Sequence, residues 1–180
     1  MKALSENPGS RIRKSIMLSI FTAIGTVINY FELLIPFSLP FLKPGLANAV
    51  TLIVLRKFGV KSALAVLSAR ILLSSFITGT FLTPVFFLSA AGGASSFAAM
   101  ALLSSIFRGR LNVLTLSLYG AVAHNYAQLA ALYFLFIHNR AVFFNIPALS
   151  LFGVAAGLAT GLAAHAVERS LDKRSLLLAA

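Results

Sequence analysis

Cysteine is absent from the 180-residue chain, and only four acidic residues stand against fifteen lysines and arginines. The missing thiols exclude disulfides and thiolate metal sites. Of the four acids, Glu32 alone lies in an apolar run, while Glu6, Glu168 and Asp172 lie near the termini. Magnesium-dependent chemistry on diphosphates needs converging carboxylates, which this chain cannot assemble within its apolar runs.

Other catalytic signatures are missing as well. The chain has no Walker A sequence for ATP hydrolysis, and no aspartate lies in an apolar run to complete a Ser-His-Asp triad. His124, His138 and His165 fall on different segments or depths, which argues against a zinc site. We therefore expect no cofactor, no metal and no catalysis by this chain alone.

Charge as a whole is scarce, because charged residues make up 11% of the chain and hydrophobic residues 59%, with a mean hydropathy of +0.93. A water-soluble domain of this length needs more polar surface than that. Apolar runs long enough to cross a hydrocarbon core of ~30 Å, which takes about 20 helical residues, recur along the chain. The sequence therefore predicts an integral membrane protein of the all-α class.

Six apolar runs predict a bundle of six transmembrane helices. The runs cover about residues 15–35, 46–58, 60–77, 84–107, 113–137 and 142–167. The first run is too long for a signal-peptide core and no A-x-A-like site follows it, so we interpret it as a retained span. The predicted organisation is an N-terminal arm (1–14), a six-helix domain (15–168) and a C-terminal tail (169–180).

The positions of the basic residues predict that both termini lie in the cytoplasm. In that orientation twelve lysines and arginines fall on the cytoplasmic side and only Lys43 and Arg140 fall outside, as the positive-inside rule expects. Because the basic residues are spread among the runs, the net charge of +11 does not indicate a nucleic-acid partner. We expect a multi-pass protein of the cytoplasmic membrane, in contact with membrane lipid.

The second run is too short for an ordinary span, since about 13 helical residues extend only ~20 Å against a core of ~30 Å. Arg56 and Lys57 fix its inner end at the surface, so its start in KPGLAN should lie within the membrane. Pro44 suits the first turn of a helix, Gly45 allows close approach and Lys43 adds charge. We expect free N–H groups there to attract an anion. An ordinary loop with a lysine that reaches the surface is the alternative.

Two ionisable side chains lie inside the predicted spans. Arg70 lies about midway along residues 60–77, where a cation costs roughly 2.5–3.5 kcal/mol on insertion scales and should face other helices or a water-filled cavity. Glu32 lies in the outer part of residues 15–35. A structural Glu32–Arg70 ion pair and a ligand-binding role both explain these residues, and the two are compatible if a ligand displaces the pairing.

A further polar group interrupts the fifth run. His124 and Gln128 are four residues apart and Asn125 is three from Gln128, so a helix should place all three on one face. Hydrogen bonds that only hold helices together are one explanation. The concentration of three such groups near the midplane favours the other, a polar cavity that this face lines.

Small residues indicate where helices can touch. Two stripes recur at four-residue spacing, namely Gly153, Gly157 and Gly161 in the last run and Ser15, Ser19 and Ala23 in the first. Such stripes permit close approach of helix backbones. We expect packing within the chain. Docking onto a partner membrane subunit is the alternative, and the first stripe is the better candidate for it.

Three segments together resemble a known family: KPGLANAVTL (43–52), RILLSSFITG (70–79) and GAVAHNYAQL (120–129). Over roughly residues 30–161 the chain resembles the Gx transporter family, also named heptaprenyl diphosphate synthase component I. The first name implies a transport protein similar to the six-helix, substrate-binding S components of energy-coupling-factor vitamin transporters, which dock a partner through small residues on the first helix. The second implies an accessory subunit of a prenyl diphosphate synthase. The synthase's aspartate-rich motif is absent, so that role would be non-catalytic.

Two hypotheses about function follow. The first is a substrate-binding membrane transport subunit for a small anionic or amphiphilic solute, with any ATPase on the other chains of a coupling module. The second is a non-catalytic membrane subunit in polyprenyl and menaquinone synthesis, which would bind a prenyl-type ligand and a soluble synthase subunit. The residues expected to line the ligand pocket are Glu32, Lys43, Asn48, Arg70, His124, Asn125 and Gln128.

Overall fold

The computed structural model of the chain describes residues 8–34 and 45–177, and within these ranges it contains six α-helices. They are α1 (Pro8–Leu34), α2 (Asn48–Phe58), α3 (Val60–Ile77), α4 (Pro84–Ile106), α5 (Val113–Leu132) and α6 (Ile146–Leu177). A π-helical turn, η1 (Tyr133–Ile137), and a 3-10 helix, η2 (Arg140–Asn145), connect α5 to α6. The all-α class predicted from the sequence is confirmed.

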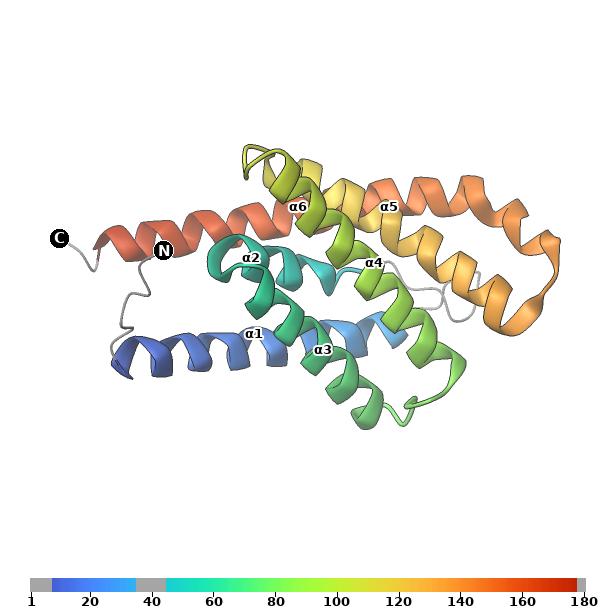
Figure 1. The fold of residues 1–180 in the computed structure, drawn as a ribbon, viewed down its shortest axis with the longest axis horizontal. Helices are drawn as coiled ribbons and strands as arrows, with labels where there is room; N and C mark the ends of the chain where they lie inside the picture. Colours follow the sequence, from blue (N-terminus) through green and yellow to red (C-terminus); the bar gives the residue numbers. More distant parts are fainter. Residues whose placement is uncertain (1–7, 35–44, 178–180) are drawn as a thin grey trace.

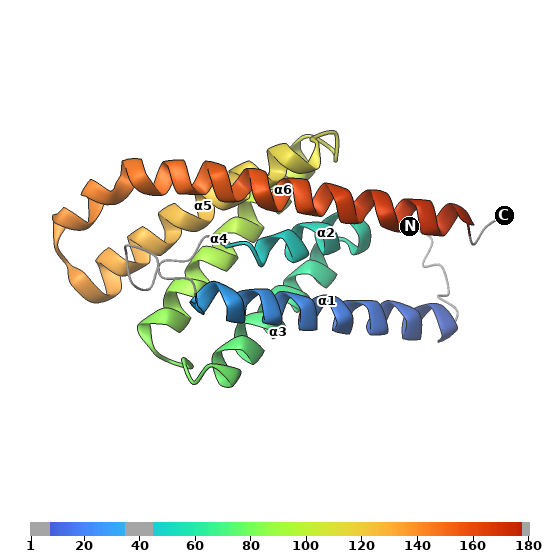
Figure 2. The ribbon, with the colours of Figure 1, turned by 180° about the vertical axis from the view of Figure 1, so that it is seen from behind.

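Successive helices run in alternating directions through the bundle (Figures 1 and 2). The start of α1, the end of α6, the α2–α3 turn and the α4–α5 turn lie toward one end of it, which we call the terminal end. The α3–α4 turn and the α5–α6 connection lie toward the other, which we call the distal end.

Four segments are long and apolar enough to cross a membrane: residues 9–34, 60–77, 84–106 and 140–170. Their length and composition mark the chain as a membrane protein. α2, with 11 residues, is too short to span on its own, as its run predicted. α5 has 20 residues, but His124, Asn125 and Gln128 lower its hydropathy.

Two helices extend beyond their predicted runs. α1 begins at Pro8, within the predicted N-terminal arm, where a proline is favourable in the first helical turn. α6 continues to Leu177, through most of the predicted C-terminal tail. Hydropathy locates where a helix is apolar, and a helix continues past that point when no residue interrupts it.

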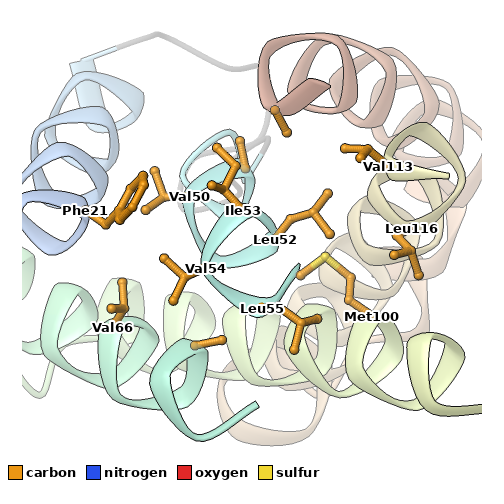
Figure 3. Close-up of a cluster of buried hydrophobic side chains, with 13 residues drawn as sticks. Phe21, Val50, Leu52, Ile53, Val54, Leu55, Val66, Met100, Val113 and Leu116 are labelled. Atoms are coloured by element: carbon orange, nitrogen blue, oxygen red, sulfur yellow. The ribbon is translucent and has the colours of Figure 1, made fainter. Parts of the chain in front are cut away.

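α2 lies at the centre of the bundle. Its residues from Asn48 to Leu55 are all buried. Figure 3 shows α2 surrounded by apolar side chains of other helices, including Phe21 of α1, Val66 of α3, Met100 of α4 and Leu116 of α5. A helix enclosed on every side must be apolar around its circumference, and TLIVL meets that condition except at its threonine.

α5 and α6 approach each other closely at the glycines of α6. A Cβ on Gly157 would lie 2.9 Å from the Cα of Leu118, and one on Gly161 would lie 3.1 Å from the Cα of Leu114. Ser117 adds a 2.8 Å hydrogen bond from its hydroxyl to the carbonyl oxygen of Gly157. The α6 stripe therefore faces α5 within the chain, and a larger residue there would push the two backbones apart.

The small residues of α1 lie elsewhere. Ser15, Ser19 and Ala23 are exposed, and the latter two line a groove of about 400 Å³ between α1 and α3. The α3 side of this groove includes Ala65 and Ala69. The stripe thus lies on the outer surface of the bundle and not in its core.

An ion pair ties three segments together at the terminal end. The Nε of Arg56 on α2 lies 2.8 Å from Oε1 of Glu168 on α6, and Nη1 donates a 3.0 Å hydrogen bond to the carbonyl oxygen of Leu111. The short helix is thereby attached to α6 and to the α4–α5 turn at the end opposite to Asn48.

Candidate functional site

The candidate site lies at the distal end of α2, where helices converge on one arginine. Arg70 of α3 is 4% exposed, and its Nη2 donates a 2.6 Å hydrogen bond to Oδ1 of Asn48 at the start of α2. The Nδ2 of Asn48 lies 3.0 Å from Nδ1 of His124 on α5. One chain of hydrogen bonds therefore joins α3, α2 and α5.

The order of these contacts determines which atom donates and which accepts in each hydrogen bond. A guanidinium can only donate, so the atom of Asn48 that faces Arg70 is the amide oxygen. The amide nitrogen then faces His124, and because that nitrogen can only donate, Nδ1 of His124 accepts. His124 in this arrangement is a neutral imidazole with its proton on Nε2.

Glu32 adds a buried carboxylate to the site. It lies near the end of α1, is 3% exposed, and its Oε1 accepts a hydrogen bond from the backbone N–H of Leu46. Its charge also interacts with the guanidinium of Arg70. This interaction offsets part of the cost of burying the charge of Arg70.

The start of α2 differs from the prediction. α2 begins at Asn48, two residues after the predicted start of the run, and a turn precedes it in which the N–H of Asn48 donates to the carbonyl oxygen of Gly45. Gly45 has φ +76°, a conformation that favours glycine. An anionic group does bind an N–H at this turn, but it is the protein's own Glu32. Lys43 and Pro44 lie outside the described residues.

Glycines from three segments make room for these side chains. A Cβ on Gly25 of α1 would lie 3.0 Å from Cδ of Arg70, and one on Gly92 of α4 would lie 2.6 Å from Cε1 of His124. A Cβ on Gly45 would lie 2.9 Å from Nδ2 of Asn48. Sequence reasoning found Gly45 but missed Gly25 and the contact of Gly92, because their partners lie on other helices.

The polar residues of α5 do not all share one environment. Gln128 is fully buried, and its Cγ lies beside Gly92 together with His124. Asn125 instead donates from Nδ2 a 3.1 Å hydrogen bond to the carbonyl oxygen of Leu149 on α6. The three residues share the buried side of α5, but one residue turns a helix by about 100°, so Asn125 contacts α6 while His124 and Gln128 contact α4.

Of the seven residues predicted to line a pocket, the structure brings Glu32, Asn48, Arg70 and His124 together and places Gln128 next to His124. The Nε atom of Arg70 is buried and has no hydrogen-bond partner among the described residues. A buried donor in that state costs ~1–3 kcal/mol, and more when it is charged. The site therefore offers a buried, cationic N–H to an oxygen acceptor.

The described residues contain no group of three or more His, Asp or Glu side chains arranged to hold a metal ion. The arrangement can bind and orient a group that carries hydrogen-bond acceptors, through one cationic and several neutral polar side chains beside a carboxylate.

Long apolar helices that run in alternating directions and enclose an arginine-centred polar site define a helical membrane protein with a buried polar site. A family model described as heptaprenyl diphosphate synthase component I matches residues 21–167 of the chain. The protein belongs to this family, which confirms the resemblance found from its three motifs. No curated protein and no solved structure matches the chain.

Proposed function

We propose that this protein is a substrate-binding membrane transport subunit that recognises an acceptor-bearing group of a small anionic or amphiphilic solute at Arg70. The observation that carries the proposal is the buried Nε of Arg70, which lacks a hydrogen-bond partner among the described residues. A cation so deep in an apolar bundle is costly, and a ligand that supplies an oxygen acceptor recovers part of that cost.

The proposed membrane arrangement has six spans with both termini in the cytoplasm. The alternating helix directions support it, as do the exposed basic residues Arg56, Lys57 and Lys61 around the α2–α3 turn at the terminal end. The site then opens toward the outer side of the membrane. Toward the cytoplasm, the buried residues 52–55 of α2 close the bundle with an apolar layer.

The charges at the site favour a solute with one anionic group over a multiply charged one. Arg70 is the only buried cation among the described residues, and the carboxylate of Glu32 already interacts with it. Several negative charges would therefore remain unbalanced in a medium of low dielectric. A monoanion, or a zwitterion whose cationic group approaches Glu32, avoids this excess.

A second candidate function is the one that the family description names, a membrane subunit of heptaprenyl diphosphate synthase. The chain would then be a non-catalytic partner of a soluble synthase subunit. The groove between α1 and α3 supports this alternative, since its volume of about 400 Å³ and its mostly apolar lining suit part of a hydrocarbon chain.

Mass spectrometry of the purified protein in mild detergent tests the proposal. We expect the wild type to retain a small solute with an anionic group, and Arg70→Met, which keeps an unbranched side chain without the charge, to lose it. Asn125→Ala is the matched control, because Asn125 bonds to α6 outside the site and its variant should retain the solute. Equal ligand content in wild type and Arg70→Met would show that the site is assigned wrongly. A prenyl diphosphate bound together with a co-purified synthase subunit would favour the second function.

A further inference from the structure

A second polar cluster lies between α1, α3 and α4, on the distal side of Arg70. The cluster is closed in this structure, with no room for a water molecule among its side chains. Its polar lining consists of Asn29 of α1, Ser74 and Ser75 of α3, Thr80 of the α3–α4 turn and Ser89 of α4. Every polar group in this lining is a neutral hydroxyl or amide.

Helix packing alone does not explain these residues. Ser74 and Ser75 are 3% and 4% exposed, although the helix that carries them has an apolar outer face. The hydroxyl of Ser75 bonds to the carbonyl oxygen of Leu72 in its own helix. The buried hydroxyl of Ser89, however, has no hydrogen-bond partner among the described residues. Polar groups gathered from three segments, one of them an unpartnered hydroxyl, indicate a place that water would favour if the helices separated there.

The cluster forms the layer next to the Arg70 site. Ser74 follows Arg70 by one helical turn on the same face of α3. On α1, Asn29 lies one helical turn after Gly25, and Gly25 packs against Cδ of Arg70. Both helices therefore extend from the arginine site into the polar cluster.

At its other side the cluster reaches the distal end of the bundle. Thr80 is half-buried and lies in the α3–α4 turn, which Figure 1 shows at that end. Its hydroxyl lies 2.8 Å from the hydroxyl of Thr78, and its carbonyl oxygen accepts a 2.6 Å hydrogen bond from Thr83. Polar groups thus occur at successive positions between the Arg70 site and the distal surface, beside the apolar side chains of Ile71 and Phe86.

We propose that this cluster opens as the passage by which water and the polar group of the ligand reach Arg70 from the distal end. The inference rests on the proposed binding role of Arg70 and adds the route to it. Neutral hydroxyls suit such a route, because they replace hydration of a polar solute without holding it as a full charge would. The passage is closed in this structure, where the half-buried ring of Phe86 contributes to its wall.

The absence of cysteine allows a direct test by single-cysteine labelling in membranes. The probe is a small, charged, membrane-impermeant methanethiosulfonate, applied to vesicles of either orientation. We expect Ser74→Cys and Ser89→Cys to react from one side only, the side opposite to that from which Lys61→Cys reacts at the terminal end. Phe86→Ala should accelerate both reactions several-fold by widening the passage.

Leu72→Cys is the matched control, since Leu72 lies on the same helix as Ser74 and faces outward. A thiol in hydrocarbon remains protonated and a charged reagent does not reach it, so we expect labelling at least about tenfold slower than at Ser74→Cys. All variants should label fully after denaturation, which shows that the thiols are intact. Labelling of Ser74→Cys and Ser89→Cys no faster than Leu72→Cys, or from the Lys61→Cys side, would overturn the passage. Since labelling needs no ligand, loss of the proposed function and loss of the passage are separate results.

Discussion

A methyl group added at Gly92 of α4 should disrupt the hydrogen bonds that join Arg70, Asn48 and His124. None of these three residues belongs to α4. In Gly92→Ala the new Cβ would lie 2.6 Å from Cε1 and 2.7 Å from Nδ1 of His124, and 2.9 Å from Cγ of Gln128. The imidazole must then move, and Nδ1 of His124 loses its 3.0 Å contact with Asn48.

The expected change in the free energy of unfolding is the sum of two destabilising terms and one stabilising term. Overpacking a buried position costs about 1–3 kcal/mol. The lost Asn48–His124 hydrogen bond adds about 0.5–1.5 kcal/mol. Alanine is better than glycine in a helix interior by about 1 kcal/mol, which offsets part of this. We expect Gly92→Ala to lower the free energy of unfolding by roughly 1–3 kcal/mol.

Gly93→Ala provides the matched control on the same helix. Its Cβ would lie 3.1 Å from Cδ1 of both Leu67 and Ile71, which are flexible side-chain ends that can shift. Its stability should stay within about 1 kcal/mol of the wild type. The measurement is equilibrium unfolding in mixed micelles, followed by circular dichroism because the chain has no tryptophan.

A double-mutant cycle with His124→Ala isolates the contact. In the His124→Ala background, Gly92→Ala should be neutral or stabilising, with a coupling energy of about 1 kcal/mol or more. If Gly92→Ala destabilises both backgrounds equally, or is as stable as Gly93→Ala, then His124 is not held where the structure places it.

Two further predictions concern the rest of the bundle. Gly157→Ala should cost about 1–3 kcal/mol because its Cβ meets backbone, the Cα of Leu118 at 2.9 Å, whereas Gly9→Ala, with nothing within 4 Å, should cost nothing in the same unfolding assay; equal stabilities would contradict the α5–α6 contact. Arg56→Gln should cost less than about 1 kcal/mol, because the Arg56 and Glu168 side chains are 26% and 14% exposed. That cost should shrink in high salt, and a salt-independent loss would point to the bond with Leu111 instead.

The helices themselves could be predicted because their cause is local. The third run, residues 60–77, coincides with α3, and the fourth and fifth begin at the residues where α4 and α5 begin. Uninterrupted apolar residues favour a helix in a membrane wherever they occur, since only a helix satisfies its own backbone there. The helix ends were less predictable, as α1 and α6 show, because polar residues can continue a helix.

The candidate site could be predicted in its members but not in its connections. Arg70 and Glu32 stood out because an ionised residue in an apolar run is costly wherever it lies. Helical spacing grouped Asn125 with His124, but α5 contacts α4 on one side and α6 on the other, and neighbouring residues divide between them. Only the rotation of the helix within the bundle decides which partner each residue meets.

The sequence by itself determined the membrane class, the helical secondary structure and the identity of the costly buried charges, because each depends on the transfer of local groups from water into hydrocarbon. The tertiary structure decided which polar groups meet. The bonds that join Arg70 to Asn48 and Asn48 to His124 connect positions 22 and 76 residues apart in the chain. Their formation depends on glycines of other helices that let the side chains approach, and no local pattern encodes that geometry.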